Sequence, residues 1–500
     1  MNHGLHWIDF VILALYAAAM IALGWYYGRR QQSMDEYFTG GGRMNPLLIG
    51  VSLFATLFST ISYLAMPGEV LNHGPIVPLM QLLAIPFYYY IVGHLMAPMY
   101  MKHRATSAYA LLESQLGLGA RTTGAVMFVM LRLMWMSTLI FLASKAMLVM
   151  LGLDDQWLPV VTLATGSIAI FYASMGGLRA VVITDSIQFM LLFCGALMVI
   201  GMVTYDVGGL TWLPTRWNES WDEQPLFDID PTVRVTVVGS VFYGVLWWVC
   251  TAGGDQTAIQ RFMATKDAAA ARRSFLVNSI AGGAVAVVLV LVGFALLAYY
   301  QADPSRLPAD KTIAEHADEL FPYFISNHLP VGLSGLVMCG MFAAAMSSID
   351  SGINSITAVV TTDLVDRFRI KRLDDKSRVR FARWLALTIG LVVVLMSSFV
   401  IDHVPGNFLE QAKRTFGLLV TPMFLLFLFA LFIPFATQGG AIVGAVVGFV
   451  ASFVIAYWDL LTGLPTISFQ WIFPVSLSAG AVAGCVWSVL QASTTRNMLK

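Results

Sequence analysis

The chain has few charged residues and few cysteines for its length. Lys, Arg, Asp and Glu make up 12% of the 500 residues and balance to a formal net charge of zero, whereas soluble domains carry about a quarter charged residues. No basic region predicts a nucleic-acid partner. The four cysteines, Cys194, Cys250, Cys339 and Cys485, lie in apolar segments without CxxC spacing, so neither a disulfide framework nor a zinc site is expected. No nucleophile–base cluster recurs, and the protein is not expected to be an enzyme.

Apolar residues dominate the rest of the sequence. Hydrophobic residues account for 58% of the chain, with a mean hydropathy of +0.74, which predicts an all-α integral membrane protein. About 20 consecutive apolar residues suffice for one helix to cross a bilayer. The sequence predicts about thirteen such transmembrane helices in a single domain, 1–500. They cover residues 8–28, 46–70, 76–100, 122–152, 157–175, 181–205, 233–256, 275–300, 331–362, 381–401, 408–434, 439–459 and 471–491.

Lys and Arg residues concentrate in alternate loops. They follow the first, third, seventh and ninth predicted helices, and the seventh is followed by Arg261, whereas the loop at 206–232 is acidic. Because positive loops stay in the cytoplasm, this pattern predicts a plasma-membrane protein with its N-terminus outside and its C-terminus in the cytoplasm. The first helix lacks the basic start of a cleavable signal peptide, so we expect it to be retained.

Two of the predicted helices are interrupted by polar or helix-breaking residues. Ser59, Thr60 and Ser62 lie in the middle of 46–70, and 233–256 ends in a polar segment with two glycines. Broken helices in corresponding positions of two halves are typical of inverted repeats, although ordinary kinks are the alternative. The repeat interpretation assigns residues 46–205 and 233–434 to the two repeats. It leaves residues 8–28 and 439–491 as peripheral helices.

A stripe of small and oxygen-bearing residues lies in the predicted helix at 331–362. Ala344, Ser347 and Ser351 follow one another at helical spacing, and Asp350 lies among them. A carboxylate at bilayer depth is costly and mostly faces a cavity, an ion or a partner. Hydroxyls and carbonyls are ligands that hard cations prefer. The stripe therefore predicts a cation site, with close helix packing as an equally weighted alternative.

Three sequence patches resemble the sodium–solute symporter family, which includes sodium/glucose cotransporters, proline permease and sialic acid symporters. The first patch runs from Asp35 to Arg43 and leads into 52–56, the second covers 176–188, and the third covers 344–363. They occur in the order seen in the family. The resemblance implies a five-plus-five inverted-repeat (LeuT-like) core in which the first helix of each repeat is broken. It also implies that solute and sodium bind near the membrane midplane.

The resemblance implies a first sodium site between the first broken helix and the segment at 344–363. In the family the ion is bound there by backbone carbonyls and hydroxyls, and carbonyls become free only where a helix is unwound. The corresponding residues are Ala55, Phe58, Ala344, Ser347 and Ser348. Sodium would hold the two helices together, and its loss would loosen the inward-facing state.

A second sodium is a further expectation from the resemblance. Some family members bind it next to an aspartate, with serines from the facing helix. The corresponding residues here are Asp185, Asp350 and Ser351. Asp350 departs from the family, in which a small hydroxyl residue is typical at this position. Taken alone, Asp185 favours a helix cap or an ion pair, for example with Arg179.

Polar residues inside the predicted helices are candidates for solute binding. Sialic acid symporters use a serine of the broken helix, a glutamine and an arginine, and the sugar cotransporters use a glutamine of the tenth core helix, where Lys413 lies here. The candidates are Ser59, Ser62, Gln81, Arg132 and Lys413. Leu57 stands where sialic acid symporters have a hydroxyl, which weakens the match to sialic acid.

Two of these candidates are cations. Arginine binds carboxylates through two parallel hydrogen bonds, so Arg132 and Lys413 favour a sialic or other sugar acid, or a monocarboxylate. A structural ion pair is the alternative for Arg132, and snorkelling to the membrane interface is the alternative for Lys413. The resemblance thus implies a sodium-coupled secondary active symporter that imports a small organic solute by alternating access. A neutral sugar or polyol is the alternative solute, and a non-transporting receptor or sensor is the alternative function.

Overall fold

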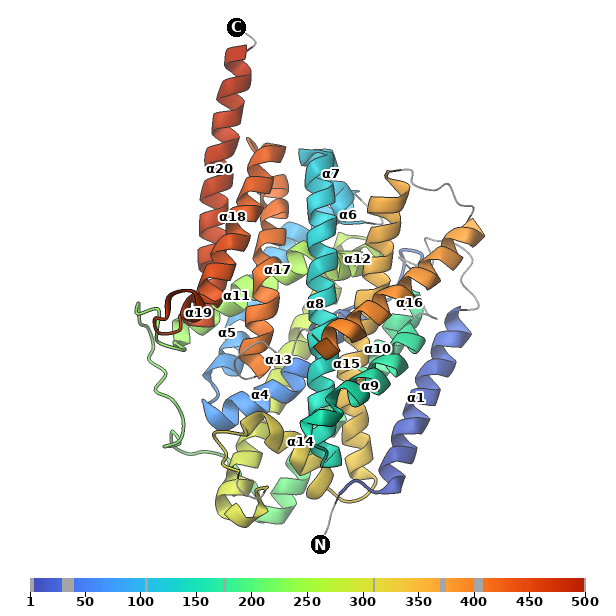
Figure 1. The fold of residues 1–500 in the computed structure, drawn as a ribbon, viewed down its shortest axis with the longest axis vertical. Helices are drawn as coiled ribbons and strands as arrows, with labels where there is room; N and C mark the ends of the chain where they lie inside the picture. The colour runs from blue at the N-terminus through green and yellow to red at the C-terminus, as the bar shows by residue number, and fades with distance from the viewer. Residues whose placement is uncertain are drawn as a thin grey trace.

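The structure is a computed structural model that describes residues 4–28, 40–103, 107–173, 177–308, 311–368, 375–399 and 408–498. Over these residues the chain forms α-helices with short 3-10 and π segments, and none of them lies in a strand. Long helices run between two ends of the molecule, with the N-terminus at one end and the C-terminus at the other (Figure 1). The prediction of an all-α protein is confirmed.

The first half of the chain contains long helices, two short helices (α6 and α7) and one helix that is broken into two parts (α3 and α4). A π segment, Tyr90–Met96, joins α5 to α6. The helices are α1 (Trp7–Gly28), α3 (Pro46–Leu57), α4 (Thr60–Asn72), α5 (Ile76–Tyr89), α6 (Ala97–His103), α7 (Tyr109–Leu116), α8 (Leu118–Leu151), α9 (Leu158–Ala173) and α10 (Leu178–Val207).

The second half begins with another helix in two parts. A π segment, Val360–Asp366, extends α15 toward the end of its span. The helices are α11 (Val237–Gly254), α12 (Gln256–Met263), α13 (Ala268–Ala302), α14 (Ala317–Asn327), α15 (Leu333–Val359), α16 (Asp375–Phe399), α17 (Phe408–Phe432), α18 (Gln438–Ala456), α19 (Trp458–Thr462) and α20 (Ile472–Met498).

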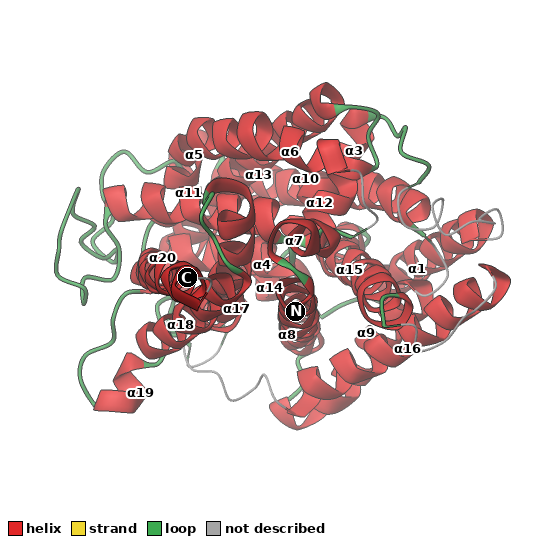
Figure 2. Cartoon of the chain, turned by 90° about the horizontal axis from the view of Figure 1, so that it is seen from above, coloured by secondary structure: helices red, strands yellow, loops and turns green. Residues whose placement is uncertain are grey.

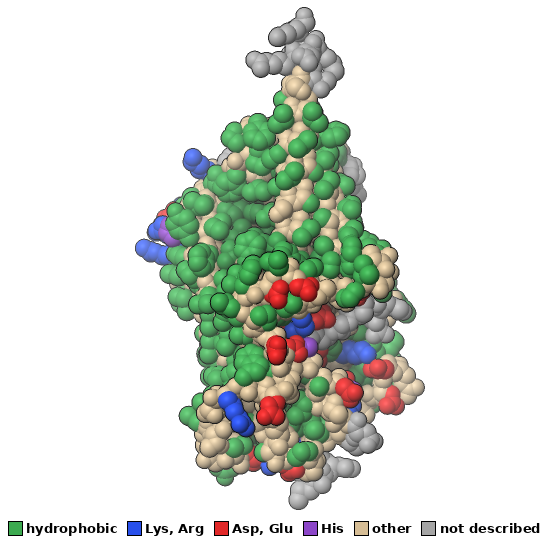
Figure 3. Space-filling view, turned by 90° about the vertical axis from the view of Figure 1, so that its left-hand side faces the viewer, with side chains coloured by type: hydrophobic (Ala, Val, Ile, Leu, Met, Phe, Trp, Pro, Cys, Tyr) green, Lys and Arg blue, Asp and Glu red, His purple; other side chains and the backbone are tan. Residues whose placement is uncertain are grey.

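Most of the long helices are able to cross a membrane. Among the described residues, eleven helices are long and apolar enough, and α3 with α4 forms a twelfth span bent by 59°. The predicted helix at 157–175 corresponds to α9, whose 16 residues are fewer than the roughly 20 of a full span. Hydrophobic side chains cover most of the upper half of one face, and acidic side chains gather in its lower half, while basic side chains occur there and at the upper left edge (Figure 3).

The first break separates α3 from α4. Phe58 and Ser59 have extended backbone, with ψ angles of 111° and 175°. Asn45 caps the start of α3 by accepting a hydrogen bond from the Leu47 N–H, and Pro46 follows at the first helical position, where its missing N–H costs nothing. Because α3 ends at Leu57 and the Phe58 N–H bonds the Phe54 carbonyl, the carbonyls of the last three residues of α3 have no helical partner and become available to side chains or ions.

The second break separates α11 from α12 at Asp255. The Asp255 carboxylate accepts a hydrogen bond from the Thr257 N–H at 2.7 Å and thereby caps α12. A Cβ atom at Gly254 would lie 3.1 Å from the Phe424 Cα of α17, so glycine lets the backbone of the break lie close to that of α17. Both predicted interruptions are therefore present, and each leaves helix ends inside the protein.

Helix α15 lies in the middle of the fold and is buried along nearly its whole length. It packs against α10, α8, α1 and α3. Seen from above, α1, α9 and α16 lie on one side of it, and α18 to α20 lie on the opposite side of the molecule (Figure 2). Gly340 brings α15 against the backbone of α10, since a Cβ there would lie 2.9 Å from the Leu191 carbonyl oxygen.

Replacing Gly340 with leucine should therefore destabilise the protein. The new side chain would separate α15 from α10, and overpacking of this kind costs about 1–3 kcal/mol. Gly201→Leu is the matched control, because a Cβ at this exposed position of α10 meets no atom within 4 Å. Thermal unfolding of both variants in detergent measures the difference, and equal melting temperatures would contradict the close approach of the two helices.

Candidate functional site

A small cavity lies beside the break between α3 and α4. It offers about 80 Å³ of space and is lined by residues of α3, α4, α5, α8, α11 and α17. Ser59, Ser62 and Gln81, three of the residues predicted to bind solute, line this cavity. The structure therefore brings these three side chains together at a point where the backbone is not helical.

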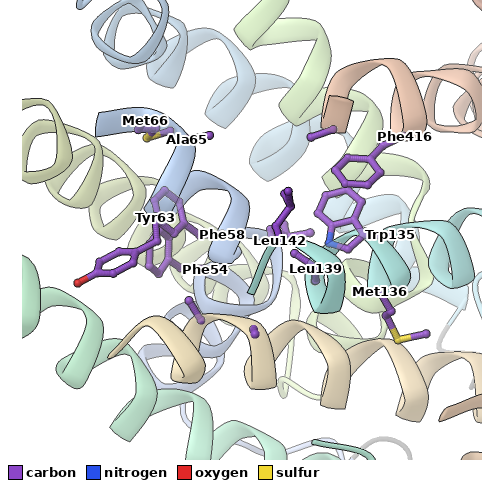
Figure 4. Close-up of a cluster of buried hydrophobic side chains, with 14 of the residues drawn as sticks. Phe54, Phe58, Tyr63, Ala65, Met66, Trp135, Met136, Leu139, Leu142 and Phe416 are labelled. Atoms are coloured by element: carbon purple, nitrogen blue, oxygen red, sulfur yellow. The ribbon is translucent and has the colours of Figure 1, made fainter. Parts of the chain in front are cut away.

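Aromatic rings form most of the remaining wall. The Trp135 ring of α8 stacks on the Phe416 ring of α17, with centroids 4.3 Å apart, and the two rings lie face to face in Figure 4. Trp247 of α11 also stacks on Trp135, with centroids 5.9 Å apart, and the Tyr243 ring lies 6.4 Å from that of Trp247. Aromatic rings thus form much of the cavity wall, alongside a few polar side chains.

Several hydrogen-bond donors meet at the cavity. Ser59 precedes α4, and its side chain does not cap the first N–H groups of that helix. These groups carry the partial positive charge of a helix N-terminus. The Trp135 indole N–H is buried without a hydrogen-bond partner, although a buried indole N–H usually has one. The donor set suits an acceptor-rich group such as a carboxylate.

Arg132 does not line the cavity. It is completely buried, and its guanidinium lies 2.5 Å from the Asp255 carboxylate and 2.6 Å from the Thr257 hydroxyl. The structure thus favours the structural ion pair over a direct solute contact for Arg132. The pair joins α8 to the second break. Lys413 belongs to α17, and its side chain lies outside the described residues.

The residues predicted for the first sodium lie on facing parts of α3 and α15. The Ser347 hydroxyl donates to the Ala55 carbonyl at 2.7 Å and lies 3.2 Å from the Ala344 carbonyl. The Ser348 hydroxyl donates to the Thr56 carbonyl at 2.9 Å. Phe58 lies at the break and lines the cavity. Neutral hydroxyl and carbonyl oxygens gathered in this way fit a monovalent hard cation.

A guanidinium lies where the second sodium was expected. Asp185 is completely buried, accepts a hydrogen bond from Ser52, and lies 3.2 Å from Arg261. The Ser351 hydroxyl lies 2.6 Å from the same guanidinium and 2.8 Å from the Thr56 hydroxyl. Asp185 and Ser351 therefore do not fit a second sodium in this arrangement. The expected partner of Asp185, Arg179, is replaced by Arg261.

The position of Arg261 corrects the sequence analysis, which assigned this residue to a positive loop. Every residue of α12 is buried, because α12 is the inner part of a broken helix rather than a loop. An amphipathic eight-residue helix after a break gives no span-length signal, so the sequence alone did not identify it. Asp350 is also buried on α15 and lies near Tyr16 of α1, as Asp185 does. Its assignment to a sodium site stays a prediction.

A second group of charged side chains lies near α14. Arg234 contacts both carboxylate oxygens of Glu69 on α4 at 2.8 Å and Glu410 on α17 at 3.0 Å. Asp318 of α14 accepts a hydrogen bond from the Phe408 N–H at 2.8 Å. Burial raises the pKa of Asp318 to about 7, and the nearby Glu69 and Glu410 add to this effect.

A helical membrane domain with two broken helices, a cavity at the first break and an oxygen cluster beside it defines a secondary transporter. The model of the sodium:solute symporter family matches residues 37–448. The chain belongs to this family, and the resemblance stated from its sequence patches is confirmed.

Two relatives show the breadth of this similarity. The sodium/sialic acid symporter SiaT of Proteus mirabilis is 29% identical over 461 residues, which cover 88% of each chain. Human sodium-coupled monocarboxylate transporter 1 is 28% identical over 87% of this chain and 71% of the relative. Members of the family that carry different organic anions are therefore similar to this chain to nearly the same degree.

Solved structures agree with the fold. A sodium-coupled sialic acid symporter in a substrate-bound, outward-open state has a TM-score of 0.81 and 26% identity, with 97% of each chain covered. The inward-facing conformation of Mhp1 has a TM-score of 0.57 at 11% identity, covering 91% of this chain and 92% of that one. The latter likeness concerns the fold alone.

The raised pKa of Asp318 predicts that acidification stabilises the protein. An ordinary aspartate has a pKa near 3.8, so between about pH 4 and pH 7 the folded state holds a proton that the unfolded state lacks. Stability contributed by Asp318 is therefore gained as pH falls through about 7. We expect Asp318→Asn to be more stable than wild type at pH 8, by on the order of 2 kcal/mol because Asp318 keeps partial contact with water.

Melting temperatures at pH 8 and pH 5.5 test this expectation. Asp318→Asn retains an acceptor for the Phe408 N–H but should lose most of the wild-type difference between the two pH values. Asp154→Asn, at an exposed position before α9, serves as the control. A variant that is destabilised equally at both pH values would contradict the role of Asp318.

Proposed function

We propose that this protein is a sodium-coupled symporter that imports a compact monocarboxylate by alternating access. The observation that carries the proposal is the cavity at the first helix break, which is bounded by three polar side chains and a wall of aromatic rings. Phe58 belongs both to this cavity and to the residues assigned to the first sodium. Solute and ion would therefore share one unwound segment, which is the physical requirement for coupled binding.

The carboxylate of the solute would bind at the start of α4. Ser59 and Ser62 provide hydroxyls, Gln81 provides an amide, and the Trp135 indole N–H lacks a partner. The N-terminus of α4 adds a favourable field for a negative charge. All of these donors are neutral. Arg132 is not assigned to the carboxylate, because its charge is already neutralised by Asp255.

The aromatic wall favours a solute with an apolar body. A sugar acid would bring several hydroxyl groups against Trp135, Trp247 and Phe416, where few acceptors or donors could pair with them. Leaving a polar group unpaired in a closed site costs about 1–3 kcal/mol each. A sialic or other sugar acid is the second candidate, because the similarity to a sialic acid symporter extends over 97% of the chain.

The first sodium would bind between α3 and α15. We assign to it the carbonyl oxygens of Ala55, Phe58 and Ala344 and the hydroxyls of Ser347 and Ser348. When sodium binds, the two hydroxyls would turn their lone pairs to the ion instead of donating to α3 carbonyls. The ion would then join α3 to α15 and fix the start of α4, where the solute carboxylate binds.

The proposal also includes the orientation of the chain in the membrane and its division into repeats. We place the N-terminus outside and the C-terminus in the cytoplasm of the plasma membrane, on the distribution of Lys and Arg among the loops. We assign α3 to α10 and α11 to α17 to the two inverted repeats, because each set begins with a broken helix. α1 and α18 to α20 would be peripheral, and their positions on opposite sides of the molecule support this division (Figure 2).

Ser348→Ala should weaken sodium binding without unfolding the protein. Loss of one oxygen ligand is expected to raise the apparent sodium dissociation constant about tenfold, equal to about 1.4 kcal/mol. Thermal stabilisation by sodium, with choline as the replacement cation, measures this constant. Ser452→Ala is the control, since Ser452 is a buried serine of the peripheral helix α18. Unchanged sodium dependence in Ser348→Ala would contradict the assigned site.

Trp135→Phe tests how the carboxylate is recognised. The substitution keeps an aromatic ring in the wall but removes the unpartnered N–H together with one ring of the indole, so carboxylate binding should weaken about five- to tenfold. Binding of pyruvate, butyrate, nicotinate, sialic acid and glucose is measured by thermal stabilisation in sodium and in choline. The control is Trp212→Phe, because the Trp212 indole donates to Thr204 far along the chain from the cavity.

The panel also decides between the candidate solutes. A sodium-dependent shift with the small carboxylates alone would support a monocarboxylate symporter. A shift with sialic acid alone would favour the sugar-acid candidate, and a shift with glucose alone would overturn recognition of a carboxylate. Sodium-independent binding of any solute would contradict coupling.

A further inference from the structure

Four oxygen atoms from four helices surround the Arg261 side chain. The hydroxyls of Ser52 on α3 and Ser351 on α15 lie 2.9 Å and 2.6 Å from its nitrogens. The Thr257 carbonyl of α12 lies at 3.1 Å, and the Asp185 carboxylate of α10 lies at 3.2 Å. Hydroxyl, carbonyl and carboxylate oxygens are also the atoms that bind hard metal cations. The surroundings of Arg261 are therefore those of a cation site.

We propose that Arg261 is a tethered cation that occupies the position of a second sodium ion, so that this protein binds one sodium per solute. This inference rests on the proposed function, because it concerns the number of ions that accompany the solute. The guanidinium is part of α12 and cannot be released, so it neutralises Asp185 throughout the transport cycle without being transported.

The balance of charge supports this assignment. Arg261 and Asp185 are both fully buried and pair with each other, as Arg132 and Asp255 do. A sodium ion added between Ser351 and Asp185 would place a second positive charge beside a carboxylate that is already neutralised. The cost of an uncompensated charge inside a protein is several kcal/mol. Asp350 of α15 is a further buried carboxylate and lies near Tyr16, as Asp185 does, so Arg261 is assigned to Asp185 through the direct contact between the two.

The tethered cation also lies next to the first sodium site. The Thr56 carbonyl accepts a hydrogen bond from Ser348, and the Thr56 hydroxyl contacts Ser351, which contacts Arg261. One residue of α3 therefore touches both the hydroxyl assigned to sodium and the serine that holds the guanidinium. Arg261 is thus a positioning residue for the sodium site as well as a replacement for the second ion.

Counting bound ions tests the proposal. Equilibrium binding of radioactive sodium to the purified full-length protein should give one sodium per wild-type molecule. Arg261→Ala should bind two, because the oxygens around Asp185 become available to an ion. Arg261→Lys, which keeps the positive charge, should bind one. The double variant Arg261→Ala with Asp185→Asn should also bind one, and because it removes both buried charges it keeps the test valid if Arg261→Ala fails to fold.

A second measurement separates ion replacement from a purely structural role. Guanidinium at millimolar concentration should raise the melting temperature of Arg261→Ala more than choline does, and should not affect wild type in this way. Two sodium ions bound to wild type, falling to one in Asp185→Asn, would overturn the proposal while leaving sodium coupling intact. No sodium bound to wild type would overturn the proposed function itself, and with it this inference.

Discussion

The neutralisation of charge inside an apolar protein is the constraint on which the rest of this structure depends. Each of the two deeply buried arginines lies against an aspartate, Arg132 with Asp255 and Arg261 with Asp185. An isolated charge at this depth would cost far more than any packing contact contributes. Each pair also joins an element of the first half of the chain to the second broken helix. The same interactions that neutralise these charges therefore hold the second break, with its exposed helix ends, in place.

The first break depends on a different set of contacts. Its carbonyls accept hydrogen bonds from Ser347 and Ser348, which belong to the most buried helix of the protein. Short polar contacts, in addition to hydrophobic packing, thus hold α3 close to α15. An ion that competes for the same oxygens changes how tightly these two helices are joined. In the proposed function, coupling between ion and solute needs no long pathway, because the cavity assigned to the solute begins at the end of α3.

Much of this arrangement could be predicted from the sequence. Apolar length and the positions of Ser59, Ser62 and the Gly253–Gly254 pair identified the membrane helices and both breaks. Ser59, Ser62 and Gln81 were predicted to bind solute, and the structure places all three on the wall of one cavity. The sequence could not show which charges pair. Arg261 follows a span at loop distance, and only the fold of α12 into the interior brings it to Asp185, 76 residues away in the chain.

The packing of the aromatic wall could not be predicted from the sequence either. Trp135, Trp247 and Phe416 come from three helices, and tryptophans at such spacings are common in membrane interfaces as well as in cores. Stacking of Trp135 on Phe416 is a tertiary property that periodicity does not encode. For Arg132 the sequence left two interpretations open, a solute anchor and a structural ion pair, and only the tertiary structure shows its contact with Asp255.

The narrowness of the cavity has a pharmacological consequence. With about 80 Å³ of space, the stacked rings of Trp135 and Phe416 would lie close around a solute bound as we propose. A carboxylate with a long or branched apolar tail would bind by the same head group, yet its tail would keep α8 and α17 apart. Such a molecule would occupy the transporter without crossing the membrane. Competitive blockers of this protein can therefore be designed by lengthening a transported acid at the end remote from its carboxylate.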